Sequence, residues 1–249
     1  MYESTITFTL DTICPWTYLA KKRSLSSSRH FSKHNIHPTN LNIPTNQPAA
    51  LRLVRQTDAS TKVIFTLKYA PYQLNPEASK EGEDKYAWYR KSRYGNSEEQ
   101  MATYMKIMTA YGQTAGINYK FGGTVANTID AHRVIQHFQE EKGPETADKI
   151  VKSLYRMYFE EEKHPSSEET LVKACVEAGV DEKEAREFVN DEYEGLMDVK
   201  NMIREQAGNG VDSVPYVVIE GRRRDITIVG AKDVEDYVKA LEQIVKESN

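Results

Sequence analysis

The sequence contains little cysteine. Only Cys14 and Cys175 occur among 249 residues, which excludes a disulfide scaffold and a cysteine-rich zinc site. Each thiol is then either a small buried hydrophobic group or a reactive nucleophile. Cys175 falls on the apolar face of an expected helix and is assigned to the core, so Cys14 is the candidate nucleophile.

Long hydrophobic runs are also absent. No apolar stretch approaches the ~20 residues of a membrane span, and Met1–Leu10 lacks the basic and apolar regions of a signal peptide. A net charge of -4 and a pI near 5.9 argue against a protein that binds nucleic acid by neutralising phosphates. We therefore expect a cytoplasmic protein without a membrane or nucleic-acid partner.

Acidic residues are missing between Asp11 and Asp58, a window that holds seven lysines and arginines. Within it, Ser24–Pro48 is rich in serine, asparagine, threonine and proline, and its apolar residues have no period. Such a segment buries too little apolar surface to offset its ordering entropy, so it predicts a disordered insertion. Its three histidines have no carboxylate or thiol nearby, and no metal site is expected there.

The two flanks of this segment are both helix-like. Trp16–Arg23 joined directly to Ala49–Gln56 would form one amphipathic helix, which suggests that the insertion interrupts a helix. The segment either belongs to the native protein or is a retained intron read in frame. We predict that deleting Ser24–Pro48 raises the melting temperature, because the deletion restores the helix. A lower melting temperature in the deletion variant would contradict this.

The two ends of the chain carry β patterns. Thr5–Leu10 alternates polar and apolar residues, and Lys62–Tyr69 is a second β-rich run; with the helix between them they predict a right-handed βαβ unit. Near the C-terminus, Val214–Ile219 and Ile226–Val229 predict two strands, and Lys232–Glu247 predicts an amphipathic helix. Together the two halves predict a small sheet flanked by helices.

The region from residue 76 to residue 208 has helical patterns. Capping signals and glycine stops divide it into helices over residues 97–112, 128–141, 145–162, 166–179, from 181, and 191–207. The expected fold class is therefore α/β. Residues 1–75 and 209–249 form the sheet domain, and residues 76–208 form a large all-α insertion.

Cys14 lies at the junction of a strand and a helix. A helix N-terminus presents free N–H groups and a partial positive charge, which favour a thiolate and lower the cysteine pKa. Pro15 suits the first helical turn. This position favours a reactive Cys14 over a buried inert one.

The strand expected at Val214–Ile219 contains a proline near its start. Pro215 lacks the N–H that a central ladder needs. Although cis is not the default for an X–Pro bond, the position of Val214–Pro215 opposite the turn at Cys14 favours it.

Four motifs in order resemble one family. They are Asp11–Trp16, Asn127–Arg133, Val211–Ile219 and Ile228–Ala231. They resemble the DsbA-like branch of the thioredoxin superfamily. The closer similarity is to the FrnE-type group, which is related to 2-hydroxychromene-2-carboxylate isomerases and kappa-class glutathione transferases. The resemblance implies a thioredoxin-like fold with a large helical insertion.

The resemblance also implies site residues. Pro215 would be cis and lie beside Cys14, and the Val214 backbone would bind an extended peptide or glutathione by strand addition. Asn127 and His132 would face the catalytic cleft. The alternatives are that Asn127 only caps a helix and that His132 is a buried imidazole with satisfied hydrogen bonds. Pro15 and Trp16 are further substrate-binding candidates.

The sequence departs from the redox members of the family at Thr17, where they have a second cysteine. A dithiol oxidase needs that second thiolate to resolve the mixed disulfide. Three functions stay open: a monothiol oxidoreductase that uses Cys14, a glutathione-dependent transferase or isomerase in which Thr17 helps to activate the glutathione thiol, and a redox-inactive peptide-binding scaffold. Glutathione is the expected co-substrate, no tightly bound cofactor or metal is expected, and a homodimer is an open alternative.

Overall fold

The computed structural model describes residues 1–23 and 62–248. The expected insertion Ser24–Pro48 and the expected helix Ala49–Gln56 lie outside the described residues. The arrangement below therefore concerns the remaining chain, which contains the sheet, the helical region and all the candidate site residues.

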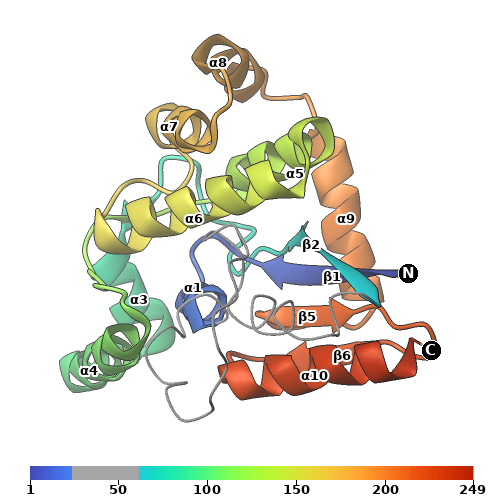
Figure 1. Cartoon of the computed structure of the whole chain (residues 1–249). Coiled ribbons are helices and arrows are strands. Elements are labelled where there is room, and N and C mark those ends of the chain that lie inside the picture. Colours follow the sequence, from blue (N-terminus) through green and yellow to red (C-terminus); the bar gives the residue numbers. More distant parts are fainter. Residues whose placement is uncertain (24–61, 249) are drawn as a thin grey trace.

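A four-stranded sheet forms the centre of the protein (Figure 1). Its strands, in the spatial order β2-β1-β5-β6, are β2 Val63–Pro71, β1 Tyr2–Leu10, β5 Tyr216–Ile219 and β6 Ile226–Val229. β1 runs parallel to β2 and antiparallel to β5, with Phe8 opposite Val217. The N-terminal βαβ half and the C-terminal hairpin thus join into one sheet through β1 and β5.

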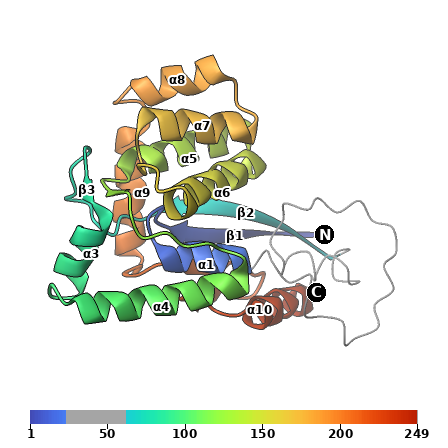
Figure 2. The same cartoon turned by 90° about the vertical axis from the view of Figure 1, so that its left-hand side faces the viewer.

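Helices cover both faces of the sheet, as Figures 1 and 2 show. On one side lie α1 (Pro15–Arg23) and α10 (Val234–Glu247). On the other side lie α5 (Ile129–Lys142) and α6 (Pro144–Glu160). The helices α7 (Glu168–Ala178) and α8 (Glu182–Asn190) lie outermost on this side. The helix α9 (Leu196–Gly208) packs against β2.

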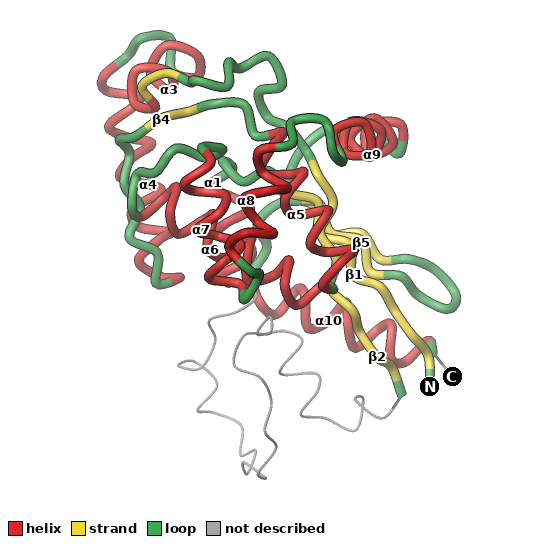
Figure 3. The backbone as a smooth tube through the Cα atoms, turned by 90° about the horizontal axis from the view of Figure 1, so that it is seen from above, coloured by secondary structure: helices red, strands yellow, loops and turns green. Residues whose placement is uncertain are grey.

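The inserted region is not entirely helical. Besides α3 (Lys85–Arg93) and α4 (Glu98–Ala115), it contains a two-stranded ribbon of β3 (Glu83–Asp84) and β4 (Thr124–Val125), which the sequence analysis missed. Strands of two residues are too short to show a period. This part of the protein lies away from the two chain ends (Figure 3).

Aromatic stacking joins α1 to the helical region. The Tyr18 ring stacks on Tyr155 with centroids 4.9 Å apart and on Phe159 at 5.5 Å, and it meets Tyr119 edge to face at 6.0 Å. All four residues are buried. Since such rings bury large apolar areas in specific geometries, they fix α1, and with it Cys14, against α6.

The helix α4 does not end at Gly112 as predicted. It continues to Ala115, and Gly116 terminates it in the left-handed conformation with φ of 69°. Gly112 is needed for another reason, because a β-carbon there would lie 2.6 Å from the Tyr119 ring. The glycine therefore permits close packing instead of stopping the helix.

Two other helix starts and one strand start differ from the prediction. α7 is capped by Ser167 and not by Ser166, whose hydroxyl donates to the Asn127 carbonyl. α9 begins at Leu196 and not at Asp191, whose carboxylate accepts backbone N–H groups in a local turn. β5 begins at Tyr216. Local hydrogen bonds and backbone turns set these boundaries of the helices and the strand, and the hydrophobic pattern does not reveal them.

Candidate active site at Cys14

A tight turn carries the chain from β1 into α1. The Cys14 N–H donates to the Asp11 carbonyl at 3.0 Å, and the Cys14 carbonyl accepts the N–H of Tyr18 at 3.2 Å. Cys14 therefore occupies the cap position of α1, as the sequence analysis expected. The free N–H groups of the first turn lie next to its side chain.

The structure brings Cys14 and Pro215 together. The Cys14 thiol donates to the Val214 carbonyl with Sγ and O 3.7 Å apart, although the two residues are 200 positions apart in the chain. The Val214–Pro215 bond is cis. The pairing of Thr9 with Tyr216 between β1 and β5 sets this juxtaposition.

The expectation of an acidic thiol at Cys14 is wrong for this structure. The pKa of Cys14 is raised to about 11, chiefly by burial and also by the nearby Asp11 carboxylate, while the Thr17 and Trp16 N–H groups and the Thr17 hydroxyl act in the opposite direction. The side chain is only 3% exposed. Loss of hydration therefore disfavours the thiolate more than the helix N-terminus favours it. The sequence pattern had predicted the opposite balance.

Thr17 occupies the position of the second family cysteine and is fully buried. Its hydroxyl lies 2.7 Å from the Cys14 carbonyl oxygen and 3.0 Å from the Asp11 carbonyl oxygen. It also lies close enough to the Cys14 sulfur to stabilise a thiolate. Thr17 thus fixes the turn and contacts the reactive group.

His132 lies next to Asp11, a residue that the sequence analysis quoted within a motif but gave no role. The Nε2 atom of His132 is 3.5 Å from Oδ1 of Asp11. His132 is 1% exposed and Asp11 is 0% exposed. Among the described residues, neither ring nitrogen of His132 has a hydrogen-bond partner. The alternative of a fully hydrogen-bonded buried imidazole is therefore not what the structure shows.

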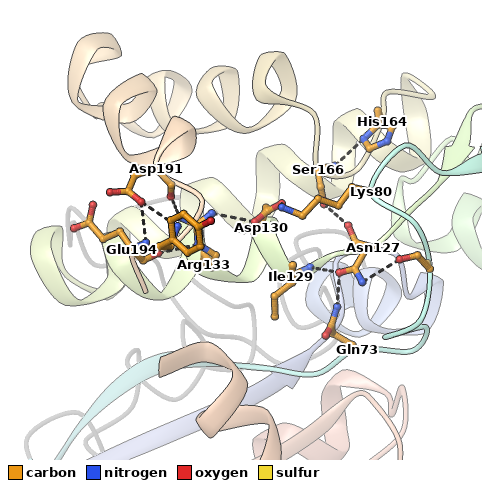
Figure 4. Close-up of polar contacts among 12 residues, drawn as sticks. Gln73, Lys80, Asn127, Ile129, Asp130, Arg133, His164, Ser166, Asp191 and Glu194 are labelled. Carbon is orange, nitrogen blue, oxygen red and sulfur yellow. Dashed lines mark hydrogen bonds and ion pairs between the residues drawn. The ribbon is translucent and has the colours of Figure 1, made fainter. Parts of the chain in front are cut away.

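Asn127 holds a loop (Figure 4). Its Oδ1 accepts the N–H of Ile129 at 2.9 Å and the amide of Gln73 at 2.8 Å, and its Nδ2 donates to the carbonyls of Pro76 and Ala78. Only the bond to the Ile129 N–H is of the kind that the capping interpretation expects, because the cap residue of α5 is Thr128 and the other contacts hold the loop. A role in substrate binding stays a prediction.

Arg133, beside His132, is a second residue to which the sequence analysis assigned no role. Its buried guanidinium pairs with Asp130 at 2.9 Å and donates to the carbonyls of Glu194 and Asp191 (Figure 4). These contacts tie α5 to the segment that begins α9.

The surface beside the thiol is aromatic. Pro15 is buried and its carbonyl accepts the Tyr119 hydroxyl at 2.8 Å, while Trp16 is 38% exposed and meets Tyr111 edge to face. Tyr119 also lines a small pocket with room for about one water-sized group. Lys85 lines this pocket, and burial lowers its pKa to about 8.

Among the described residues, no three histidine, cysteine, aspartate or glutamate side chains gather in an arrangement that could hold a metal ion. None of the helices in residues 1–23 and 62–248 is both long and apolar enough to cross a membrane.

The chain is similar to known proteins over nearly its whole length. The structure of a probable DsbA oxidoreductase from Streptomyces coelicolor matches with a TM-score of 0.73 at 22% identity, covering 98% of this chain and 91% of that chain. A 2-hydroxychromene-2-carboxylate isomerase matches with a TM-score of 0.58 at 15% identity, covering 96% and 93%. The cytosolic disulfide reductase DsbM from Pseudomonas aeruginosa matches with a TM-score of 0.56 at 11% identity, covering 97% and 95%. No protein of curated function matches the chain.

These similarities confirm the thioredoxin-like α/β fold with a helical insertion that the sequence analysis expected. The sequence profile of the DSBA-like thioredoxin domain matches residues 5–242. The candidate site at Cys14 and Pro215 lies inside the matched range. The chain therefore belongs to the DSBA-like thioredoxin domain family.

Proposed function

We propose that this protein is a monothiol, glutathione-dependent thiol–disulfide oxidoreductase. The observation that carries the proposal is the position of the Cys14 sulfur, at the N-terminus of α1 and 3.7 Å from the Val214 carbonyl. A sulfur in this position is presented beside a backbone that can pair with an extended peptide. The matching structures of a probable DsbA oxidoreductase and of DsbM, which also has a structure with glutathione, support this choice.

The reaction follows from the single thiol. The Cys14 thiolate attacks a substrate disulfide, so that a mixed disulfide forms at Cys14 and the other substrate sulfur leaves as a thiolate. A glutathione thiolate then attacks the substrate sulfur of this mixed disulfide, and Cys14 leaves as a thiolate. A second glutathione reduces the resulting glutathione–substrate disulfide, which gives oxidised glutathione and the substrate thiol. Because Thr17 replaces the second cysteine, the resolving thiol comes from solution. We place this reaction in the cytoplasm, where glutathione is abundant.

A second function is favoured by the high pKa of Cys14. A thiol that stays protonated at neutral pH is a weak nucleophile but still a hydrogen-bond donor. In a glutathione-dependent transferase or isomerase, Cys14 and Thr17 would orient the glutathione sulfur instead of reacting themselves. The match to a 2-hydroxychromene-2-carboxylate isomerase agrees with this alternative.

The test is glutathione-dependent reduction of a small disulfide, followed by coupling the oxidised glutathione to NADPH consumption. We expect turnover by the wild-type protein and a rate equal to the uncatalysed reaction for Cys14→Ser, because no other described thiol contacts the site. Cys175→Ser is the matched control: Cys175 is buried in α7, its pKa is raised by burial to about 12, and its loss should leave the rate unchanged.

Three outcomes distinguish the candidates. A glutathione adduct on Cys14 in the mass spectrum, together with turnover, supports the monothiol reaction. Conjugation or isomerisation activity that survives Cys14→Ser supports the alternative. A wild-type protein with no adduct, no disulfide reduction and no conjugation or isomerisation activity would reject both and leave a peptide-binding scaffold.

A further inference from the structure

Three ionisable groups meet in a region that is closed to solvent. Cys14, Asp11 and His132 are 3%, 0% and 1% exposed. Each unbalanced charge in such a place is unfavourable because it loses its hydration. A thiolate at Cys14 would put a second negative charge beside the Asp11 carboxylate, so the resting site opposes the reactive form of the thiol.

We propose that His132 is a positioning residue that controls the thiol of Cys14 through Asp11: when His132 is protonated it neutralises the Asp11 carboxylate, and this permits a thiolate at Cys14. The step is a proton transfer without a change of oxidation state. The thiol loses its proton and the imidazole gains one, so the net charge of the three groups is one negative unit before and after. The inference rests on the proposed function, because it concerns the same thiol.

The geometry holds the Asp11 carboxylate in a fixed orientation between its partners. Oδ2 accepts the N–H of Leu74 at 2.7 Å, and Oδ1 accepts the N–H of Ile13 at 3.4 Å and faces His132 Nε2 at 3.5 Å. The loop that contains Leu74 is held by the contacts of Asn127. The carboxylate is therefore unable to turn away from the imidazole when the local charge changes.

The tyrosines around the three residues stay neutral at physiological pH. Burial raises the pKa of every tyrosine that interacts electrostatically with Cys14 or Asp11, namely Tyr72, Tyr89, Tyr104, Tyr119, Tyr155 and Tyr158. Asp212 is exposed, and its carbonyl accepts the Tyr72 hydroxyl. The His132 imidazole is the basic group that faces the Asp11 carboxylate, with Nε2 3.5 Å from Oδ1.

The test measures the rate at which iodoacetamide alkylates Cys14 as a function of pH, by mass spectrometry of the Cys14 peptide. The four proteins are the wild type, His132→Gln, Asp11→Asn and the double variant. We expect His132→Gln to slow alkylation at pH 7 about tenfold, because the carboxylate then always opposes the thiolate. We expect Asp11→Asn to be faster than the wild type, and the double variant to equal Asp11→Asn.

Equal alkylation rates in Asp11→Asn and in the double variant are the decisive result, since they show that His132 acts through Asp11. An equal slowing by His132→Gln in both backgrounds, or an unchanged pH profile in a folded His132→Gln protein, would overturn the proposal. His137→Gln is the matched control. His137 lies on the same helix but stacks on Phe188 at 3.9 Å, and its loss should not change the profile.

A second measurement needs no variant that changes the site. In an NMR titration of the wild-type protein, the His132 ring signals should change in the same pH step as the Cys14 β-carbon signal, because the two groups share one proton-transfer equilibrium. Changes of the two signals in separate steps would also overturn the proposal. If alkylation of the variants follows the expected order but the wild-type protein has no glutathione-dependent turnover, the proposed function is rejected and this inference stands. If the wild-type protein turns over but the variants have the same alkylation profile, this inference is rejected and the proposed function stands.

Discussion

Thr17→Cys is expected to convert the site from a monothiol to a dithiol. After mild oxidation, the variant should contain an internal disulfide with Cys14, which the wild-type protein does not form. Residues three apart at a helix start have Cα atoms about 5 Å apart, within the range that a disulfide spans. The Thr17 side chain already lies close to the Cys14 sulfur. The new thiol would resolve mixed disulfides, so disulfide exchange should no longer depend on glutathione.

Thiol titration of the denatured, oxidised protein measures this change. The wild-type protein should show both of its thiols free, and Thr17→Cys should show only that of Cys175. Thr17→Ser is the control, because it keeps the hydroxyl that faces the Asp11 and Cys14 carbonyls and adds no thiol. Adducts with glutathione or disulfide-linked dimers, in place of an internal disulfide, would show that the two side chains do not meet.

Asp148→Ala is expected to have the largest effect on stability. Lys21 of α1 donates to the Tyr69 hydroxyl of β2 at 2.6 Å and pairs with the Asp148 carboxylate of α6, to which Tyr69 also donates. The Lys21 and Asp148 side chains are 5% and 11% exposed. Removing one partner of a buried ion pair reduces the free energy of unfolding by about 3–5 kcal/mol.

Urea unfolding at pH 7 measures this loss, and its pH dependence adds a check. Burial lowers the pKa of Lys21, and loss of the carboxylate lowers it further. The unfolded state then binds more protons than the folded state, so the stability of the variant should rise between pH 7 and pH 10.

The matched control is Glu187→Ala, which removes the exposed pair with Lys183 and should cost less than about 1 kcal/mol. A loss of that size for Asp148→Ala, without the rise at high pH, would mean that the buried trio contributes little to folding.

The sheet could be predicted because its signals are local. Thr5–Leu10 alternates strictly, and the hydrophobic run at Val214–Ile219 lies opposite it in the observed sheet. The ribbon of β3 and β4 escaped prediction because two residues show no period. The role of Gly112 escaped because its close neighbour, Tyr119, is on another segment.

The candidate site was only partly visible in the sequence. The motifs around Cys14, His132 and Pro215 were recognisable, and the structure places Cys14 beside Val214 and the cis bond to Pro215. Asp11 was quoted within a motif but given no role, because its burial and its contact with His132 appear only in the tertiary structure. Asn127 was expected in the cleft, but its side-chain amide is bonded to the chain itself.

The sequence by itself determined the family, the order of strands and helices, and the position of Cys14 at the start of a helix. These properties follow from periodicity, caps and short motifs, which are contained in neighbouring residues. Only the tertiary structure decided the chemistry of the thiol. Its burial and the approach of His132 to Asp11 depend on segments more than a hundred residues apart, and desolvation by those segments outweighs the local effect of the helix N-terminus.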